Sequence, residues 1–218
     1  MISFSSDVDI LRYEPALFSE LYAGGQVLAE GTSGELSGTT FTAAGADFVS
    51  ARIEAGGVIY LRGDDGLLDM SAEIVSVDSA TALSVSVVRA DSEGDAIAPP
   101  GASDISYRIS TFSPQASDAG KQLAQHFGLS EDSDNGGISV DGVIEKDVLR
   151  QVSVFAVISG VYAMLASRDG DEHFWKKSLY YRKLFEKARE RCCLEIDSGS
   201  DGVADTVLIG GCGKLGRG

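Results

Sequence analysis

Glycine is distributed unevenly along the chain, and this distribution limits the possible folds more than any other feature. The 26 glycines, set against only 4 prolines, gather between Gly24 and Gly101 and again after Gly199. Between Pro114 and about Ile196 there are few glycines, and long apolar and basic side chains dominate. Because glycine marks turns and is unfavourable inside helices, the shift predicts a strand-rich part followed by a helical part.

The strand-rich part, residues 27–112, alternates apolar and polar side chains with period two. Turn signals rich in Gly, Asp and Ser separate the apolar runs at residues 55–57, 63–66, 78–81 and 91–94. This spacing predicts a small antiparallel barrel or sandwich. The expected strands are Phe48–Ile53, Val58–Leu61, Ile74–Val77, Leu83–Val87 and Ile105–Phe112.

Helix start signals occur at two places. Ser5 and Ser6 precede two acids, which predicts a helix that Pro15 should divide in two, with a buried stripe at Ile10, Leu11, Leu17, Phe18, Leu21 and Tyr22. Ser113–Pro114 predicts a second start, because proline is tolerated at the first helical position.

The strongest apolar segment runs from Val148 to Leu165. Its most apolar stretch, 152–166, is about 15 residues, shorter than the roughly 20 that span a bilayer. It is therefore expected to be the central helix of a bundle. A final amphipathic helix should pack on it with the stripe Phe174, Trp175, Leu179, Tyr180, Leu184, Phe185 and Ala188.

The predicted fold class is α+β: a small helical bundle with an inserted antiparallel β-barrel or sandwich and an extended C-terminal tail. The bundle would comprise residues 1–26 and 113–197, and the β-domain residues 27–112. The tail, residues 198–218, should be flexible, with Val207–Ile209 as a short strand.

The acidic balance restricts the partners. The chain has 33 Asp and Glu against 18 Lys and Arg, a formal charge of -15, which argues against a protein that coats DNA. Three cysteines cannot form a disulfide framework, which favours a reducing compartment. The first residues do not resemble a secretory signal, so we expect a protein made and used in the cytosol.

No catalytic constellation is recognisable in the sequence. The two histidines, His126 and His173, lie near predicted helix ends without a neighbouring nucleophile pattern. Phosphate-cradling, zinc-protease and dinucleotide motifs are also absent from the sequence. We therefore expect no enzyme activity.

Two segments could bind metal. Cys192 and Cys193, read as consecutive helical residues, would point about 100° apart, so idle or buried thiols are favoured over a zinc site. The segment Asp197–Asp205 places Asp197, Asp201 and Gly202 where a calcium loop has its first, fifth and sixth positions, with Asp205 reaching the ion through water. Leu208 stands where a closing glutamate is expected, so a solvated Asp-Gly turn remains the other interpretation.

Basic charge is concentrated on the last predicted helix. It is either a solvated face that complements the helix dipole or a contact surface for an acidic neighbour or nearby DNA. Trp175, Tyr180 and Tyr181 are correspondingly either interface anchors or core. Under the interface hypothesis the contact residues are Lys176, Lys177, Arg182, Lys183, Lys187, Arg189 and Arg191 of the helix with Val207, Leu208, Ile209, Lys214 and Arg217 of the tail.

Three stretches resemble the head-tail connector (adaptor, neck) proteins of tailed bacteriophages. Ser6–Pro15 is similar to the Asp-x-Asp-Leu start of their first helix, and Val148–Ile196 with the acidic loop that follows resembles their closing helical pair. Ala55–Tyr60 and Ile74–Leu83 resemble barrel hairpins of phage neck and tail proteins. A β-insertion of about 85 residues departs from the compact members of that family.

The resemblance implies a structural virion protein at the portal vertex, assembled in the host cytoplasm. Its helices would form a homo-oligomeric ring around the DNA channel, without sequence-specific DNA contact, and the tail from Val203 would dock on the portal. Its expected partners are the portal protein and tail or stopper proteins, with neither membrane nor cofactor. The alternative is a calcium-dependent module that reads carbohydrate or a receptor on a virion or cell surface.

Overall fold

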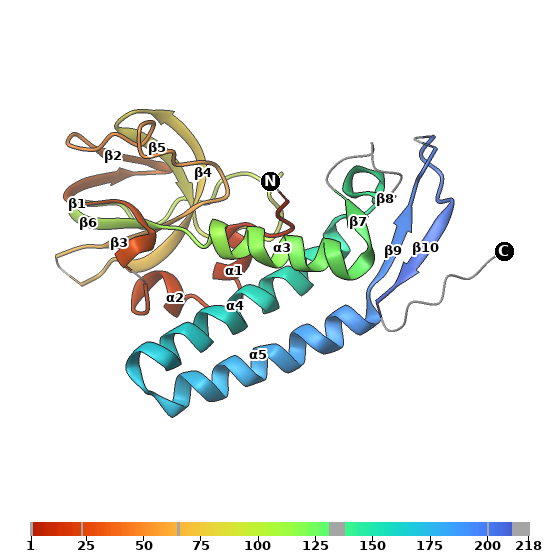
Figure 1. The fold of residues 1–218 in the computed structure, drawn as a ribbon. Coiled ribbons are helices and arrows are strands. Elements are labelled where there is room, and N and C mark those ends of the chain that lie inside the picture. Colours follow the sequence, from red (N-terminus) through yellow and green to blue (C-terminus); the bar gives the residue numbers. More distant parts are fainter. Residues whose placement is uncertain (1, 23, 65, 131–137, 200, 211–218) are drawn as a thin grey trace. The chain divides into compact units, whose positions relative to one another are not determined.

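The chain has an α+β fold that divides into two compact units (Figure 1). In the computed structural model, residues 2–22, 24–64, 66–130, 138–199 and 201–210 are described. One unit comprises residues 6–112, and the other comprises residues 1–5 and 113–218. We call them the barrel unit and the helical unit.

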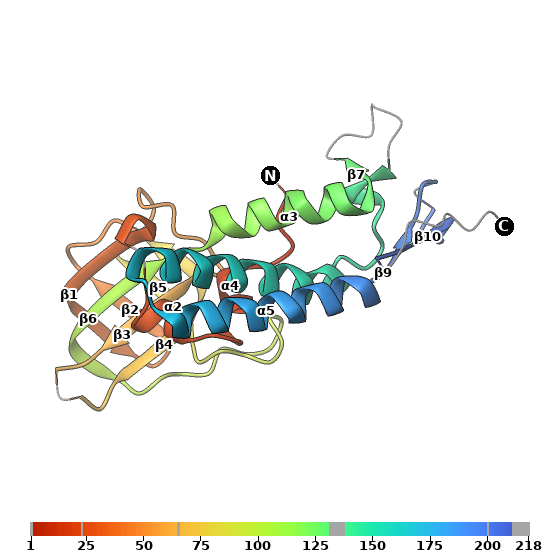
Figure 2. The same ribbon diagram turned by 60° about the horizontal axis from the view of Figure 1, so that its bottom comes forward.

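The barrel unit contains a closed antiparallel barrel, which decides between the barrel and the sandwich expected from the sequence. Around the barrel the strand order is β1-β2-β5-β4-β3-β6 (Figure 2). The strands are β1 (Val27–Ser37), β2 (Thr40–Ala43), β3 (Val58–Arg62), β4 (Asp69–Ser79), β5 (Ala82–Ser86) and β6 (Ala102–Ser110).

Three aromatic rings pack together in the barrel core, among aliphatic side chains. Phe41, Phe48 and Tyr107 lie with ring centroids 5.1 to 6.3 Å apart. Gly31 and Gly34 of β1 make room for them, since a Cβ at Gly31 would come within 2.7 Å of the Tyr107 ring and one at Gly34 within 2.6 Å of the Phe41 ring. Close packing of rings over glycine therefore fixes the interior.

The strand predicted at Phe48–Ile53 is wrong. This segment forms turns, with Phe48 and Ile53 buried and Arg52 in the left-handed region at φ 56°. The Asp47 carboxylate accepts the Ser50 amide at 2.9 Å, and the Ile53 amide donates to the Phe48 carbonyl at 3.0 Å. A side-chain cap thus replaces the strand ladder while both apolar residues still reach the core.

The first two helices are α1 (Asp7–Leu11) and α2 (Ala16–Ser19), which confirms the division at Pro15. Ser6 and Asp9 form a reciprocal capping box. Residues 6–26 were expected in the helical bundle, but these helices belong to the barrel unit because they contact β3 and β4. Of the predicted stripe, Leu21 is only half-buried and Tyr22 is 37% exposed.

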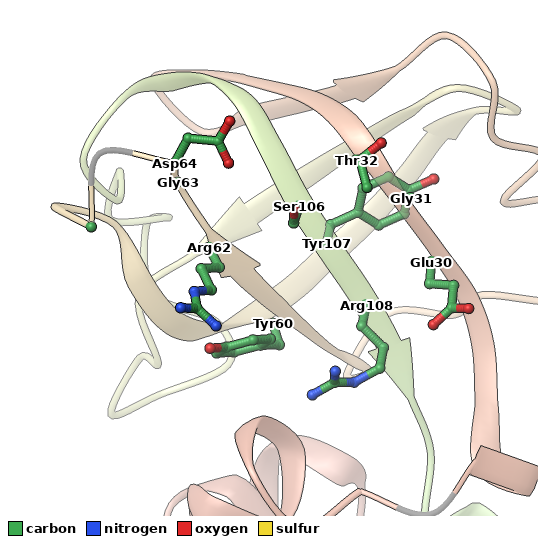
Figure 3. A pocket seen from close by; sticks show the side chains of 11 residues that line it. Glu30, Gly31, Thr32, Tyr60, Arg62, Gly63, Asp64, Ser106, Tyr107 and Arg108 are labelled. Atoms are coloured by element: carbon green, nitrogen blue, oxygen red, sulfur yellow. The ribbon is translucent and has the colours of Figure 1, made fainter.

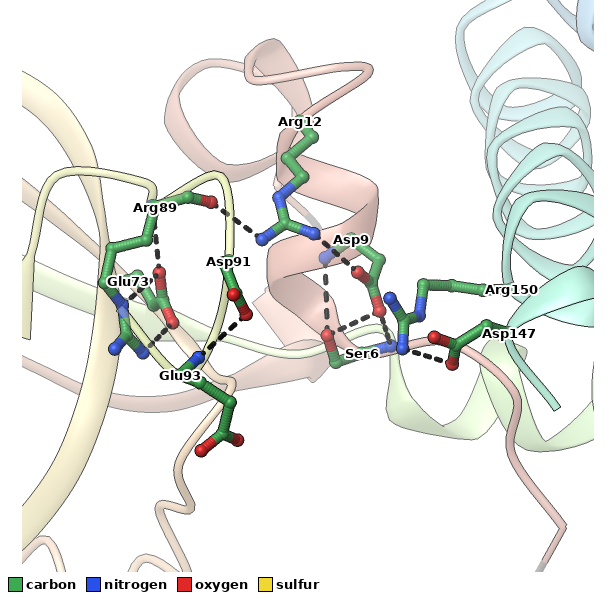
Figure 4. A network of polar contacts seen from close by, with 9 residues as sticks. All are labelled: Ser6, Asp9, Arg12, Glu73, Arg89, Asp91, Glu93, Asp147 and Arg150. Carbon is green, nitrogen blue, oxygen red and sulfur yellow. Dashed lines mark hydrogen bonds and ion pairs between the residues drawn. The ribbon is translucent and has the colours of Figure 1, made fainter. Parts of the chain in front are cut away.

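A buried ion pair lies in the barrel unit (Figure 4). Arg89 Nη2 and a Glu73 oxygen are 2.7 Å apart, and the Arg89 amide donates to the same carboxylate. Arg12, the C-cap residue of α1, donates to the Arg89 carbonyl at 2.8 Å and pairs with Asp9 at 3.1 Å. The network joins α1, β4 and the connection after β5. Each charged group in it has a hydrogen-bond or ion-pair partner.

The helical unit contains α3 (Ser113–Phe127), α4 (Asp147–Asp169) and α5 (Glu172–Arg191), with α4 packed against both others (Figure 2). Ser159 and Ser178 donate to each other's backbone carbonyls at 3.1 and 2.9 Å, which holds α4 close to α5. By length and composition alone α4, with 23 residues, could cross a membrane, and 56% of its most apolar window is buried.

Two predictions about the last helix are wrong. Trp175, Leu179 and Tyr180 were expected to pack on α4, but they are 51%, 40% and 59% exposed, while Ser178 and Tyr181 are buried. The serine pair brings the Ser178 side of α5 toward α4, so these three residues face solvent. Cys192 and Cys193 are not helical, because α5 ends at Arg191 and Cys193 begins a strand.

The helical unit also contains two short sheets. A parallel pair is formed by β7 (Leu129–Ser130) and β8 (Ile138–Ser139), and an antiparallel hairpin by β9 (Cys193–Ile196) and β10 (Thr206–Ile209). The strand predicted at 207–209 is thus confirmed. The described residues also include the 3-10 helices η1 (Gly24–Gln26) and η3 (Val140–Gly142), and residues 211–218 of the predicted tail lie outside the described residues.

Replacing Asp7 by Asn should change how stability depends on pH. Burial raises the pKa of Asp7 from its ordinary 3.8 to about 6, while its carboxylate accepts the Phe112 amide at 2.7 Å. The protonated form therefore stabilises the fold fully below pH 3.8, and this contribution disappears as pH rises through 6.

Between pH 3.5 and 7.5 the wild type should lose about 3 kcal/mol relative to Asp7→Asn. Urea unfolding of both proteins at the two pH values measures this difference. Equal differences at both pH values would contradict the assignment.

Truncating Glu73 should strongly destabilise the barrel unit. Glu73→Ala leaves the buried Arg89 guanidinium without its carboxylate and should reduce the unfolding free energy by about 3–5 kcal/mol. The double variant Glu73→Leu/Arg89→Met removes both charges and should cost less. Denaturant unfolding measures the free energy of unfolding of each variant. A double variant less stable than Glu73→Ala would contradict the destabilisation by an unpaired Arg89.

Candidate interaction surfaces

One face of α5 carries large exposed side chains and cations together. We define the α5 outer face as Trp175, Lys176, Leu179, Tyr180, Lys183, Lys187 and Arg191, all of which are exposed. Residues 175, 179, 183, 187 and 191 follow one another at intervals of four, which places them along one side of the helix. Trp175, Leu179 and Tyr180 thus lie with Lys176 in the first half of this face, and its second half carries only cations.

The seven cations predicted for an interface divide into three groups. Lys177 donates to the Tyr162 hydroxyl at 2.9 Å, and the Arg189 guanidinium lies 5.1 Å from the Phe185 ring centroid, so both contribute to packing within the unit. Lys176 and Arg182 pair with glutamates one turn away, at 3.0 and 3.2 Å. Within the described part of the chain, no side-chain partner meets Lys183, Lys187 or Arg191.

A cavity of about 590 Å³ lies beside these unpaired cations, between the first half of α4 and the second half of α5. Val152, Phe155 and Leu184 contribute apolar lining, and Lys187 and Arg191 contribute cations. This combination suits a partner segment with an apolar anchor and a carboxylate.

The β10 strand has an open edge. The Gly210 amide donates to the Cys192 carbonyl at 2.9 Å, so by alternation Leu208 and Thr206 also face β9 with their backbone groups. The backbone groups of Val207 and Ile209 point to the opposite edge of β10, where no described strand pairs with it. The side chains of these two residues are 51% and 56% exposed. Lys214 and Arg217, predicted for the same interface, lie outside the described residues.

The acidic loop between β9 and β10 turns its carboxylates toward its own backbone. Asp197 accepts the Gly202 amide at 2.6 Å, Asp205 accepts the Ser198 amide at 2.8 Å, and Asp201 accepts the Val203 amide at 2.9 Å. All three carboxylates lie near the Cα of Gly199, with atoms 3.8 to 3.9 Å from where its Cβ would stand. Among the described residues, however, no three acidic, His or Cys side chains form a group at metal-binding distances.

The two histidines lie in different parts of the helical unit, and Cys192 directly follows the end of α5. His126 Nε2 lies 3.2 Å from the Gly210 carbonyl oxygen, and His173 is exposed in the first turn of α5. Burial raises the pKa of the Cys192 thiol to about 11, which keeps it protonated and weakly nucleophilic at neutral pH.

Sequence reasoning did not find the α4–α5 cavity or the grouping of Lys183, Lys187 and Arg191. Their spacing of four was visible in the sequence, but Glu186 lies within one turn of both Arg182 and Lys183, and only the structure shows that it pairs with Arg182. Comparison of the chain with protein-family models, with curated proteins and with solved structures finds no match.

Calcium titration distinguishes the two interpretations of the acidic loop. If the loop binds calcium, the ion must displace the amides from Asp197 and Asp205, and calorimetry should show one site with a dissociation constant of about 10 μM. Asp201→Ala should abolish that signal, whereas Asp141→Ala, outside the loop, should leave it unchanged. Absence of heat in the wild type would support the Asp-Gly turn.

Proposed function

We propose that this chain is a structural protein of a tailed-phage virion, a head-tail connector that docks on the portal and links capsid to tail around the DNA channel. The α5 outer face is the observation that carries the proposal, because it combines exposed Trp175 and Tyr180 with three cations that have no side-chain partner among the described residues. Exposed aromatic residues are typical anchors of protein interfaces, and charged residues around them select the partner by its charge.

The distribution of charge supports assembly of copies. Residues 6–112 hold 17 Asp and Glu against 5 Arg and no Lys, a net charge of -12. Helix α5 holds three Glu against seven Lys and Arg, a net charge of +4. The barrel unit of one copy is thus an electrostatic complement for α5 of another, and such a heterologous contact generates rings when it closes.

The open edge of β10 supplies a second type of contact. Its outward backbone groups at Val207 and Ile209 can add a strand to a partner's sheet, and their exposed side chains can fill pockets there. Because the six-stranded barrel is closed, its strands offer no such edge. We assign β10 and the segment after it to the portal, and the α5 outer face to neighbouring copies.

Charge reversal on α5 tests the proposal. With the portal protein encoded in the same genome, mass photometry should show complexes of the wild type containing several copies. Lys183→Glu/Lys187→Glu/Arg191→Glu should reduce the formation of these multi-copy complexes at least about tenfold, since like charges then face the acidic barrel unit of the neighbouring copy.

The control Lys121→Glu/Lys146→Glu/Arg168→Glu changes the net charge equally on α3 and α4 and disrupts only exposed pairs, which are individually weak. It should assemble like the wild type. Failure of the wild type to bind portal, or equal loss in both triple variants, would count against the proposal.

The calcium-dependent binding module remains the alternative. Its support is the convergence of Asp197, Asp201 and Asp205 around Gly199, and the calcium titration above is its test.

A further inference from the structure

A cavity of about 730 Å³ lies on the barrel unit (Figure 3), within the size range of ligand sites. It is formed on the outer surface of three adjacent strands, β1, β6 and β3, with one wall from the connection that follows β3. Its polar lining includes Glu30, Tyr60, Arg62, Asp64, Ser106 and Arg108.

Strand register produces the hollow. Arg108 of β6 stands opposite Glu30 on one side and Tyr60 on the other, and Ser106 stands opposite Arg62. Because side chains two residues apart share a face, Ser106 and Arg108 belong to neighbouring rows on the barrel exterior. Ser106 is small and lies beside Arg62 and Arg108, which leaves the hollow open. In the same region the pairing of β1 with β6 shifts register between Gly31 and Gly34.

Two side chains of the wall are held in position. Arg108 donates to the Ser19 and Phe18 carbonyls at 2.6 and 3.1 Å, and its guanidinium lies 3.4 Å from the Tyr22 ring centroid. The Tyr60 hydroxyl donates to Asp69 at 2.8 Å, and burial raises its pKa, so it stays protonated at neutral pH. These contacts fix the wall before a ligand binds, which reduces the entropy cost of binding.

Other groups of the cavity retain their hydrogen-bonding capacity. The side chains of Glu30, Arg62, Asp64 and Ser106 form no hydrogen bond or ion pair with another described residue. The guanidinium offers only donors, the carboxylates only acceptors, and the serine hydroxyl both. A ligand that satisfies all of them must present donors and acceptors at neighbouring positions.

We propose that this cavity binds a neutral carbohydrate. Adjacent sugar hydroxyls both donate and accept, which matches Arg62 together with Glu30 and Asp64. Among the described lining residues, two arginines and two acids also balance in formal charge, so a phosphate would meet the carboxylates and a cation the guanidiniums. The apolar ring of Tyr60 offers a surface for the C–H side of a sugar ring. This activity is independent of the connector function and needs no calcium.

The test is NMR titration of the ¹⁵N-labelled protein with maltose, cellobiose, lactose and N,N′-diacetylchitobiose, with inorganic phosphate as the anionic probe. At least one disaccharide should shift the amides of Gly31, Ser106 and Arg108 saturably, with a dissociation constant of about 1 mM or tighter. Response to phosphate alone, or no saturable response to any disaccharide up to about 20 mM, would overturn the proposal.

Variants locate the site. Ser106→Phe fills the hollow and should weaken binding at least about tenfold, equivalent to about 1.4 kcal/mol, whereas Thr42→Phe, on the exterior of β2 and outside the cavity, should not. Glu30→Gln should weaken binding severalfold, while Glu35→Gln on the same strand should have no effect. Amide spectra of each variant verify folding, and retained affinity in a folded Ser106→Phe would refute the location.

Discussion

Closure of the barrel by β1 is the constraint on which the barrel unit depends. This strand pairs with β2 near its end and with β6 along most of its length, so the six-stranded sheet has no free edge. Closure requires the interior to accept three aromatic rings, and Gly31 and Gly34 meet this requirement by giving the Tyr107 and Phe41 rings room against β1. The same geometry determines which side chains face outward.

A closed barrel also determines how such a chain can contact other molecules. Backbone pairing with a partner is not open to its strands, so outward side chains must supply specificity, and most charged ones are acidic. The helical unit offers the complementary features: an unpaired strand edge at β10 and a cationic, aromatic side of α5. Strand addition and charge pairing are therefore available from one unit, while the other offers an acidic surface with a preformed polar hollow.

Local signals predicted the parts of the fold that local chemistry determines. The helix start after Ser5–Ser6, the break at Pro15 and the helix start at Ser113 each depend on neighbours within a few residues, and each is confirmed. The strand predicted at Phe48–Ile53 was wrong because the sequence did not show that a turn capped by Asp47 can bury Phe48 and Ile53 while the residues between them stay half-buried or exposed. The outward side of α5 was missed because both sides of this helix carry aromatic residues, and the choice depends on Ser178 meeting Ser159 nineteen positions away.

The cavity on the barrel is a stronger case of the same limit. Glu30, Tyr60, Ser106 and Arg108 come from strands separated by up to 78 positions in sequence, and only the register of β1, β6 and β3 brings them into two rows. No motif spacing encodes such a site, since each residue is unremarkable in its own strand. What the sequence does contain is the precondition: a serine between larger polar neighbours on β6, and a glycine-rich β1 that can shift register beside it. Sites of this kind exist only once the strands have paired, whereas caps and turns are determined by residues close together in the sequence.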